Sequence, residues 1–380
     1  MKIIIISPAF PPDRGGVADY SSLLADGLAE KNEVIIVTSK SEEATTEGEN
    51  RFQIVREIKS WGGLGLFRII SLIKRFSPEL IIIQYVSFLY GRGGINLAFP
   101  LLSILLRIRY RVFTMVHEPF TPFGHSIKTF LISLVQRLML FCMILGSDKI
   151  VVSIQAWERM LKRFFFWRKM DFRWIPVPSN IKISTKTHIP EKLHGFNKKP
   201  LLVFFGSLHF SKMVEYMTTS LDALIKKGYD AGLLIIGQDE KAISDYLKEL
   251  PYYLKERIFC TGYCNSDDVS RYLSASDIFL LPLIDGISSR RGSLMAALKH
   301  GLPVVTTSGF LTDDIFEQEN FTLLSPSTDK SLFIANVVRM AGDETLRDTI
   351  GKKGKEVYER YFSVRLLIER YIELYLESKD

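Results

Sequence analysis

A short segment that joins small residues to a lysine has the composition of an anion-binding turn. Residues 206–212 read GSLHFSK and follow the apolar run 201–205, so Gly206 and Ser207 form a turn after an expected strand, with Lys212 close behind. Exposed backbone amides next to a lysine ammonium are a common arrangement for binding phosphate. The segment therefore predicts contacts with a phosphorylated ligand.

A second segment, residues 282–307, predicts further contacts with such a ligand. It reads PLIDGISSRRGSLMAALKHGLPVVTT, in which a loop of glycines, serines and arginines precedes a helical run at 293–300 that ends at Gly301. The amides and the positive dipole end of that helix would face whatever lies above the preceding strand. A pyrophosphate bound there would be stabilised by both segments.

The loop after the first expected strand argues against a dinucleotide cofactor. It reads PAFPPDRGGVADY (8–20), and its adjacent Gly15 and Gly16 do not have the G-x-G-x-x-G spacing of NAD or FAD sites. A Gly-Gly pair that opens a helix either lets the backbone approach a ligand or forms a tight loop with positive φ. Both interpretations remain open.

His117 ends the apolar run 110–117 and has two interpretations by position alone. It is either a residue that faces a ligand or a strand-end histidine with its hydrogen bonds satisfied. Glu118 follows it and would orient the ring or bind an acceptor hydroxyl, although neighbours on an extended segment point in opposite directions.

Apolar runs alternate with amphipathic helical runs along the whole chain. Strand-like runs occur at 2–7, 33–39, 80–85, 110–117 and 149–154, and after a polar segment at 175–200 again at 201–207, 231–237, 257–263, 277–283 and 303–307. This pattern predicts an α/β protein with two doubly wound, Rossmann-like domains. Ligands of such sheets bind beyond the carboxyl ends of the strands, so we expect all of the motifs above to open toward one interdomain cleft.

Length and composition fit a cytoplasmic protein of two domains. The chain has 380 residues, 47% of them hydrophobic, and three cysteines with no metal-ligand spacing, which we interpret as reduced, buried thiols. The amino terminus lacks the pattern of an export signal. The longest apolar stretches, 95–106 and 130–145, are shorter than a spanning helix, so no transmembrane segment is predicted.

The chain has a net charge of +7, and some of its basic residues lie among aromatic ones, at 107–113 and 162–170. They form either solvated faces or a surface that docks on anionic lipid, which would make the protein peripheral on the inner face of the membrane. Nucleic acid is not expected as a partner, because no nucleic-acid-binding module accompanies the charge.

From Lys2 to about Phe362 the chain resembles retaining glycosyltransferases of the GT-B fold, specifically the nucleotide-sugar-dependent family 4. The matching features are the PAFPPDRGG loop, His117, Gly206, Lys212, IIGQ (235–238), DIFLLP, GLPVVTT and FTLLSPSTD (321–329). The resemblance implies an acceptor-binding domain at 1–180, a donor-binding domain at 181–361, and a helix at 362–380 that packs back on the first domain. It also implies that Lys212 contacts the donor diphosphate, that Gly15 and Gly16 lie beside it, and that His117 lies near the transferred sugar.

The chain departs from the family pattern at two places. Ser207 stands where an arginine is usual, and Ser288 and Ala296 stand where the family has two glutamates. Asp285 would replace the first glutamate if the loop is longer. We expect Arg290 or Arg291 to supply the charge that is missing at Ser207.

The resulting prediction is a metal-independent hexosyltransferase that acts on a nucleoside diphosphate sugar and a saccharide or lipid-linked acceptor. No paired-carboxylate or Asp-x-Asp motif is visible, so no metal or other cofactor is expected. We assign catalysis to His117, Lys212 and Arg291, and acceptor binding to Asp19, Tyr85 and Glu118. Donor binding is assigned to Gly15, Gly16, Gly206, Ser207, Asp285, Gly286, Ser288, Ser289, Arg290, Gly292 and Ser293.

Two alternatives remain. A sugar-nucleotide epimerase would use the same architecture but needs acid–base groups, for which His117 alone is well placed. A catalytically silent relative would also explain the missing glutamates.

Overall fold

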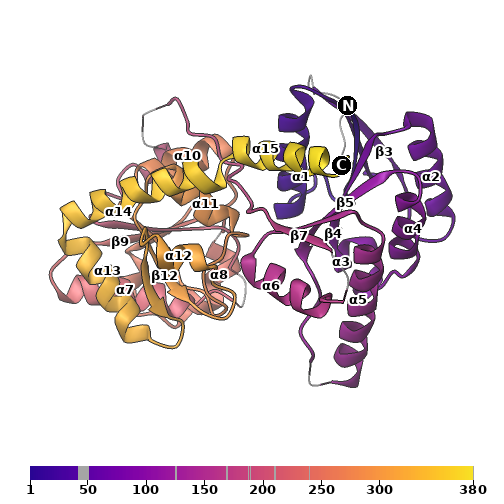
Figure 1. Ribbon diagram of the computed structural model, residues 1–380. Coiled ribbons are helices and arrows are strands. Elements are labelled where there is room, and N and C mark those ends of the chain that lie inside the picture. The colour runs from indigo at the N-terminus through magenta and orange to yellow at the C-terminus, as the bar shows by residue number, and fades with distance from the viewer. Residues whose placement is uncertain are drawn as a thin grey trace. The chain divides into compact units, whose positions relative to one another are not determined.

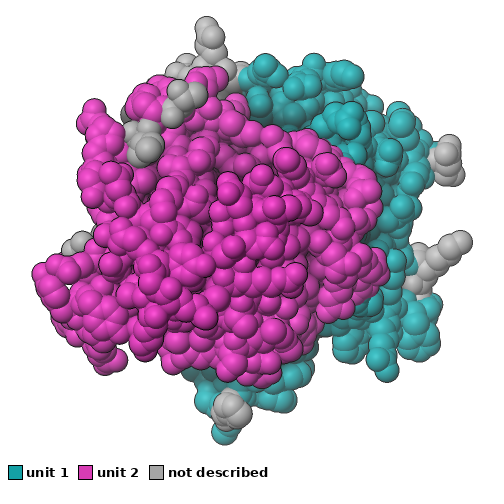
Figure 2. Space-filling model, turned by 90° about the vertical axis from the view of Figure 1, so that its left-hand side faces the viewer, with its two compact units in different colours: residues 1–176, 364–380 teal, residues 177–363 magenta. Residues whose placement is uncertain are grey.

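The computed structural model describes residues 1–41, 51–124, 126–167, 170–186, 188, 190–208, 211–238 and 240–379. They form two compact units, which Figure 2 shows in different colours. Unit 1 comprises residues 1–176 and 364–380, and unit 2 comprises residues 177–363. The sequence-based boundaries at 180 and 361 lie close to these positions, while the binding roles given to the two domains stay a prediction.

Unit 1 is built on a seven-stranded parallel sheet with the order β3-β2-β1-β4-β5-β6-β7. Residues 3–6 of the central strand have no exposed surface, because helices cover both faces of a doubly wound sheet. The strands are β1 (Lys2–Ile6), β2 (Glu33–Ser39), β3 (Gln53–Ile58), β4 (Leu80–Val86), β5 (Arg111–Glu118), β6 (Lys149–Val152) and β7 (Asp171–Trp174).

The helices of unit 1 divide between the two faces of this sheet. Because crossovers between parallel strands are right-handed, α2, α4, α5 and α6 lie on one face and α1 lies on the other. Figure 1 shows α4 among α2 and α5, and α15 beside α1, in agreement with the helix contacts. The helices are α1 (Gly16–Ala29), α2 (Leu64–Phe76), α3 (Ser87–Tyr90), α4 (Ala98–Arg107), α5 (Ile127–Leu145), α6 (Gln155–Phe164) and α15 (Val364–Glu377), with a 3-10 turn at Arg92–Gly94.

Unit 2 repeats the plan with a six-stranded parallel sheet of order β10-β9-β8-β11-β12-β13. Its strands are β8 (Leu201–Phe205), β9 (Gly232–Ile236), β10 (Ile258–Cys260), β11 (Ile278–Leu281), β12 (Val304–Ser308) and β13 (Leu323–Pro326). Its helices are α7 (Val214–Lys226), α8 (Glu240–Lys248), α9 (Tyr252–Lys255), α10 (Ser266–Ser274), α11 (Gly292–Lys299), α12 (Asp314–Gln318), α13 (Lys330–Gly342) and α14 (Glu344–Val357), with a 3-10 turn at Glu191–Leu193 and a π turn at Tyr358–Phe362. The predicted fold class, α/β with two doubly wound parallel sheets, is confirmed.

The sequence analysis missed two strands of unit 1, β3 and β7. Both lie at the edges of the sheet, and their sequences QIVREI and DFRW mix polar with apolar residues, as half-covered edge strands do. Neither contains the continuous apolar run by which the central strands were recognised.

The expected absence of a transmembrane segment stays a prediction, and the length of one helix does not support it. The apolar stretch at 130–145 belongs to the 19-residue helix α5, which is the one helix among the described residues that is long and apolar enough to cross a membrane. Its mean hydropathy is 1.7, and a third of the apolar window is buried. The helix is also tied to the loop after β5, since its buried Gln136 accepts hydrogen bonds from the backbone N–H and the hydroxyl of Thr121, both at 2.8 Å.

A buried pair of tyrosines joins the last helix to the first. The hydroxyls of Tyr20 on α1 and Tyr371 on α15 lie 3.2 Å apart, and both side chains are buried. Gly27 of α1 leaves room for Ile368 of α15, because a Cβ at that position would lie 2.6 Å from the isoleucine side chain.

We expect Tyr371→Phe to lower the free energy of unfolding by about 1–3 kcal/mol, because the Tyr20 hydroxyl would remain buried without its partner. Urea unfolding measures the loss. The matched control is Tyr375→Phe, whose hydroxyl bonds to Glu79, a carboxylate that water can solvate in its place. Equal stability of the two variants would contradict the role of the tyrosine pair.

Candidate functional site

The turn after β8 brings together three residues predicted to bind the donor. Gly206 has φ +116°, and a Cβ built on it would lie 3.3 Å from Lys212 Nζ and 4.0 Å from the Cβ of Ser293. Glycine is therefore favoured at 206 by its backbone conformation and by the space that the lysine needs. Residues distant in sequence meet here at the carboxyl edge of the sheet of unit 2.

The position of Lys212 is fixed by a short pairing between two loops. Residues 211–213 form a bridge with residues 282–284, through backbone hydrogen bonds of 3.1 and 2.9 Å. The ammonium donates a hydrogen bond to the Ser207 carbonyl and lies 4.8 Å from the centre of the Phe204 ring. The carbonyl group of residue 207, where an arginine was expected, thus helps to hold the lysine.

The environment of Lys212 disfavours its positive charge. Burial, and secondly the nearby positive charge of Arg291, lower the pKa of Lys212 from 10.5 to about 8. An anion bound beside the ammonium would reverse both effects, because it stabilises the charged form. This is the electrostatic state expected of a lysine that awaits a negatively charged ligand.

The loop between β11 and α11 holds two guanidinium groups on one carboxylate. Arg290 Nη2 lies 2.7 Å from Asp285 Oδ2, and Arg291 Nη2 lies 3.0 and 2.7 Å from the two carboxylate oxygens. Lys212 lies nearby, so three cationic side chains gather at this loop. Asp285, which we expected to contact the donor, is seen to orient both arginines.

The same loop is held in shape from beneath. Gly286 has φ +84°, and a Cβ there would lie 2.3 Å from the backbone N of Gly309. The N–H and the hydroxyl of Ser289 both donate to Asp313 Oδ2, at 2.7 and 2.6 Å. Asp313 is fully buried, and no motif in the sequence pointed to it.

The two serines of this loop have structural positions. Ser288 and Ser289 have no exposed surface, and Ser288 Oγ has no hydrogen-bond partner among the described residues. Their contact with a donor stays a prediction, and their burial favours a role in shaping the loop. Ala296, at the second glutamate position of the family, is equally buried in α11.

Helix α11 begins directly after the arginine pair. Its first residue is Gly292, its N-cap position is Arg291, and no side chain caps it. The position of a Cβ on Gly292 has no atom within 4 Å, so the helix start faces open space. The free N–H groups of a first helical turn carry partial positive charge, which adds to that of the cluster.

In unit 1, His117 lies in a β-bulge at the carboxyl end of β5. Tyr85 of β4 pairs with Val116, but the next residue, Val86, pairs with Glu118, so His117 is the extra residue on its strand. Bulges redirect side chains at the ends of strands and are frequent next to active sites.

His117 is buried, neutral and hydrogen-bonded. Its Nε2 lies 2.8 Å from Gln84 Oε1, which makes Nε2 the protonated nitrogen, and its ring meets Tyr20 edge-on at 4.8 Å. Burial lowers the pKa of His117 to about 3, so the ring carries no charge near neutral pH. It can accept a hydrogen bond through Nδ1, but it does not supply a positive charge. No motif in the sequence pointed to its partner Gln84.

The other predicted site residues of unit 1 differ in how far they are buried. Gly15 and Gly16 have no atom within 4 Å of an added Cβ, and Asp19 in the first turn of α1 is half-buried, which raises its pKa. Glu118 is exposed. Tyr85 has no exposed surface and stacks on Tyr90, so its burial favours a structural role over contact with an acceptor.

Comparisons with known proteins agree with this architecture. Residues 199–343 match the family described as Glycosyl transferases group 1. The capsular polysaccharide biosynthesis glycosyltransferase CapM of Staphylococcus aureus is 24% identical over 264 residues, which are 65% of each chain. The putative glycosyltransferase YtcC of Bacillus subtilis is 22% identical over 54% of this chain and 52% of its own. The chain thus covers less than two thirds of the length of these curated relatives.

Solved structures resemble the chain over nearly its whole length. The sucrose-phosphate synthase of Thermosynechococcus elongatus matches with a TM-score of 0.77 at 18% identity, over 99% of this chain and 98% of its own. HepE of Anabaena, solved with UDP and glucose, matches with a TM-score of 0.70 at 14% identity over the full length of both chains.

The fold and the matches define the class: the chain has the GT-B fold. Its residues 199–343 match the family described as Glycosyl transferases group 1. The predicted resemblance to group 1 glycosyltransferases of the GT-B fold is confirmed, whereas the assignment to family 4 stays a prediction.

We expect Lys212→Met to be at least as stable as the wild type near neutral pH. Because the folded-state pKa of about 8 lies below the usual 10.5, the buried charge destabilises the wild type below pH 8. This destabilisation disappears as the pH rises from about 8 toward 10.5, where the unfolded chain binds more protons than the folded one. Urea unfolding midpoints across this range should therefore rise in the wild type relative to Lys212→Met. A parallel pH dependence of the two proteins would contradict the depressed pKa.

Proposed function

We propose that this protein is a retaining, family 4 glycosyltransferase that moves a hexose-type sugar from a nucleoside diphosphate sugar to a saccharide or lipid-linked acceptor. The observation that carries the proposal is the cluster of Lys212, Arg290 and Arg291 at the start of α11. CapM acts in capsular polysaccharide biosynthesis and HepE was solved with UDP and glucose, which supports a role in surface polysaccharide or glycolipid synthesis in the cytoplasm.

The cluster suits a departing nucleoside diphosphate. As the bond from the sugar to the diphosphate breaks, negative charge develops on the phosphate oxygen that leaves, and Lys212, Arg291 and the first amides of α11 would stabilise it. The acceptor hydroxyl attacks the same face of the sugar, and its proton passes to the departing phosphate oxygen. Both steps use charges that the protein itself supplies, so we propose that no metal is required.

His117 would contribute a hydrogen bond. Since its Nε2 is occupied by Gln84, its Nδ1 remains to accept a hydrogen bond from a sugar hydroxyl. Its neutral ring also favours a transferase over the epimerase alternative, because acid–base elimination needs a group that gains and loses a proton near neutral pH. The arginine pair in turn favours an active enzyme over a silent scaffold, since cationic side chains that suit a diphosphate are present although both glutamates are absent.

The principal test is release of free nucleotide from UDP-, GDP-, dTDP-, ADP- and CMP-sugars, after a thermal-shift screen has identified the donor. We expect hydrolysis without acceptor, its persistence in the presence of a chelator, and a loss of about 100-fold in Lys212→Met, equivalent to about 3 kcal/mol of transition-state stabilisation. Lys31→Met, which removes an exposed lysine of unit 1, is the matched control.

Three results would refute parts of the proposal. Turnover near the wild-type level in Lys212→Met removes the lysine from the mechanism, and an absolute need for a divalent metal removes the metal-free chemistry. Interconversion of nucleotide sugars without release of nucleotide identifies the epimerase instead.

The arginines make a separate prediction. We expect Arg291→Ala to weaken nucleoside diphosphate binding more than Arg290→Ala, because Arg291 is the one whose charge acts on Lys212. Both losses should shrink as salt is raised, since screening weakens exposed charge contacts. Calorimetric titration at low and high salt measures them. Unchanged binding in both variants would place the two arginines outside the donor site.

A further inference from the structure

Helix α5 of unit 1 presents a row of large apolar side chains to solvent. Ile127, Leu131, Leu134 and Leu138 are between 50% and 82% exposed. Their spacing of four, three and four residues places them on one side of the helix. The opposite side, which contains Ser133 and Gln136, is buried on the sheet.

Helix α4, which packs beside α5, continues this apolar row. Leu97, Leu101, Leu105 and Ile108 are between 39% and 76% exposed and are again spaced by four, four and three residues. Within the described residues, 13 of the 26 exposed large hydrophobic side chains lie between residues 88 and 141, which is a small part of the chain. We call these eight residues of α4 and α5 the α4–α5 surface. Monomeric soluble proteins rarely expose so continuous an apolar area without a partner.

The charge of this part of the chain is strongly one-sided. Residues 80–147 contain a single acidic residue, Glu118, whereas the whole chain contains 42 acidic and 49 basic residues. The basic residues of the same segment are Arg92, Arg107, Arg109, Arg111, Lys128 and Arg137. An apolar face bordered by positive charge complements the acyl chains and anionic headgroups of a membrane surface.

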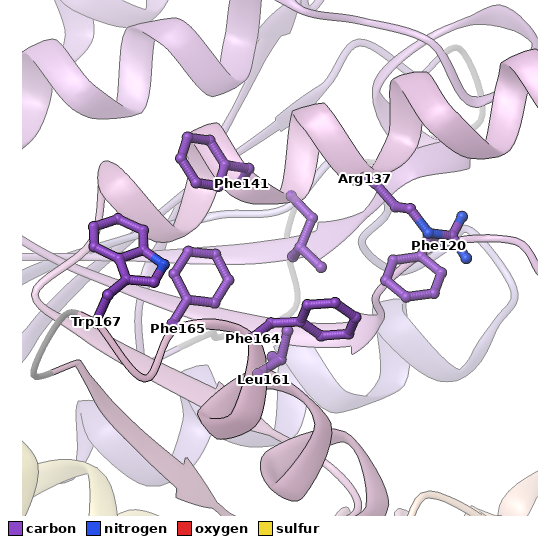
Figure 3. Close-up of a pocket in the computed structure, with 8 residues that line it drawn as sticks. Phe120, Arg137, Phe141, Leu161, Phe164, Phe165 and Trp167 are labelled. Carbon is purple, nitrogen blue, oxygen red and sulfur yellow. The ribbon is translucent and has the colours of Figure 1, made fainter.

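A pocket adjoins the α4–α5 surface (Figure 3). Its volume is about 190 Å³. Among the described residues, Arg137 is the one charged residue that lines it, beside Phe120, Leu140, Phe141, Leu161, Phe164, Phe165 and Trp167. Figure 3 shows Arg137 and Phe120 at one end of the pocket and Trp167 and Phe141 at the other. The Arg137 guanidinium lies 3.8 Å from the Phe120 ring and 3.7 Å from the Phe123 ring. The apolar area thus extends from α5 toward the end of α6.

The aromatic run at 162–170 divides between this surface and the core. Phe164, Phe166 and Trp167 are 57% to 85% exposed, but Phe165 is 7% exposed and stacks on Phe141. The basic run at 107–113 leads from the end of α4 into β5, and only Ile108 and Arg109 of it are exposed. The two runs singled out in the sequence are therefore the borders of a larger apolar surface, whose centre is α5.

We propose that the α4–α5 surface docks on an anionic lipid bilayer, with α5 lying in the plane of the interface. A spanning arrangement does not suit this helix, because its buried side is hydrogen-bonded to the loop after β5. Gln136 accepts from the backbone N–H of Thr121, and the hydroxyl of Ser133 donates to the Thr121 carbonyl. The proposal rests on and deepens the proposed function, since a lipid-linked acceptor lies in the same bilayer. The occupant is the bilayer rather than a second copy of the chain, because two copies would bring like charges together.

The test compares two triple variants of the full chain. In the first, Leu131, Leu134 and Leu138 of α5 are replaced by glutamine. In the matched control, Tyr252, Tyr263 and Phe310 of unit 2, which are also well exposed, are replaced by glutamine. Both sets remove exposed apolar surface, so neither should lower the thermal unfolding temperature.

Binding is measured by co-sedimentation with vesicles of phosphatidylglycerol and phosphatidylcholine, and with vesicles of phosphatidylcholine alone. We expect the wild type and the control to sediment with the anionic vesicles at low salt and to be released at high salt, and the α5 variant to lose at least tenfold in affinity. Arg109→Glu and Lys128→Glu should each weaken binding to the anionic vesicles about fivefold or more.

Any of three results would overturn the proposal: no binding of the wild type to anionic vesicles, equal binding of the α5 variant, or a dimer in solution that the α5 variant dissolves while vesicle binding is absent. Nucleotide release from the donor sugar, measured without vesicles, separates this proposal from the proposed function. The α5 variant should retain it, so a failure of membrane docking and a failure of catalysis give different results.

Discussion

The close approach of three cationic side chains beside β8 and α11 is the constraint on which the candidate site depends. One carboxylate, Asp285, holds two guanidinium groups, and a third cation, Lys212, is placed where burial and Arg291 oppose its charge. Such a cluster is unfavourable when empty and favourable around an anion, so free energy that destabilises the unliganded protein becomes binding energy for the ligand. Much of the surrounding backbone serves to keep these charges close. The bridge between 211–213 and 282–284 and the bonds from Ser289 to Asp313 fix the two loops that carry them.

The two units provide their polar groups in different electrostatic states. In unit 2 the groups are charged, and burial and a neighbouring cation oppose the charge of Lys212. In unit 1 the strand-end histidine is neutral, because burial keeps His117 unprotonated, and Gln84 accepts a hydrogen bond from one of its nitrogens. The first arrangement suits a leaving group that gains negative charge. The second suits the recognition of uncharged hydroxyls, where a fixed charge would bring no specificity and would cost desolvation.

The central strands could be predicted from the sequence because strands that are buried on both faces must be continuously apolar, as in residues 3–6. The edge strands β3 and β7 could not, since half-covered strands mix polar with apolar residues and lack a continuous apolar run. Within the site, glycines, arginines and the lysine were recognisable by their types and order. Their partners were not, because Asp313 and Gln84 reach the site through tertiary packing that no local pattern encodes. For the same reason the sequence could not show that Tyr85 and Ser288 are buried, or that Arg290 and Arg291 share one carboxylate.

The return of the last helix to the first unit has a consequence for how the chain folds as it is made. Unit 2 is one continuous segment, residues 177–363, but unit 1 needs residues 364–380 as well. A growing chain therefore completes unit 2 while the α1 face of unit 1 still lacks α15. The hydrogen bond between the hydroxyls of Tyr20 and Tyr371 joins residues that are 351 positions apart in the sequence. Closing so long a loop is slow compared with forming local contacts. Unit 1, whose first residues are synthesised first, is thus the last unit to be completed. A chain that ends before α15 would leave the apolar side of α1 exposed to solvent.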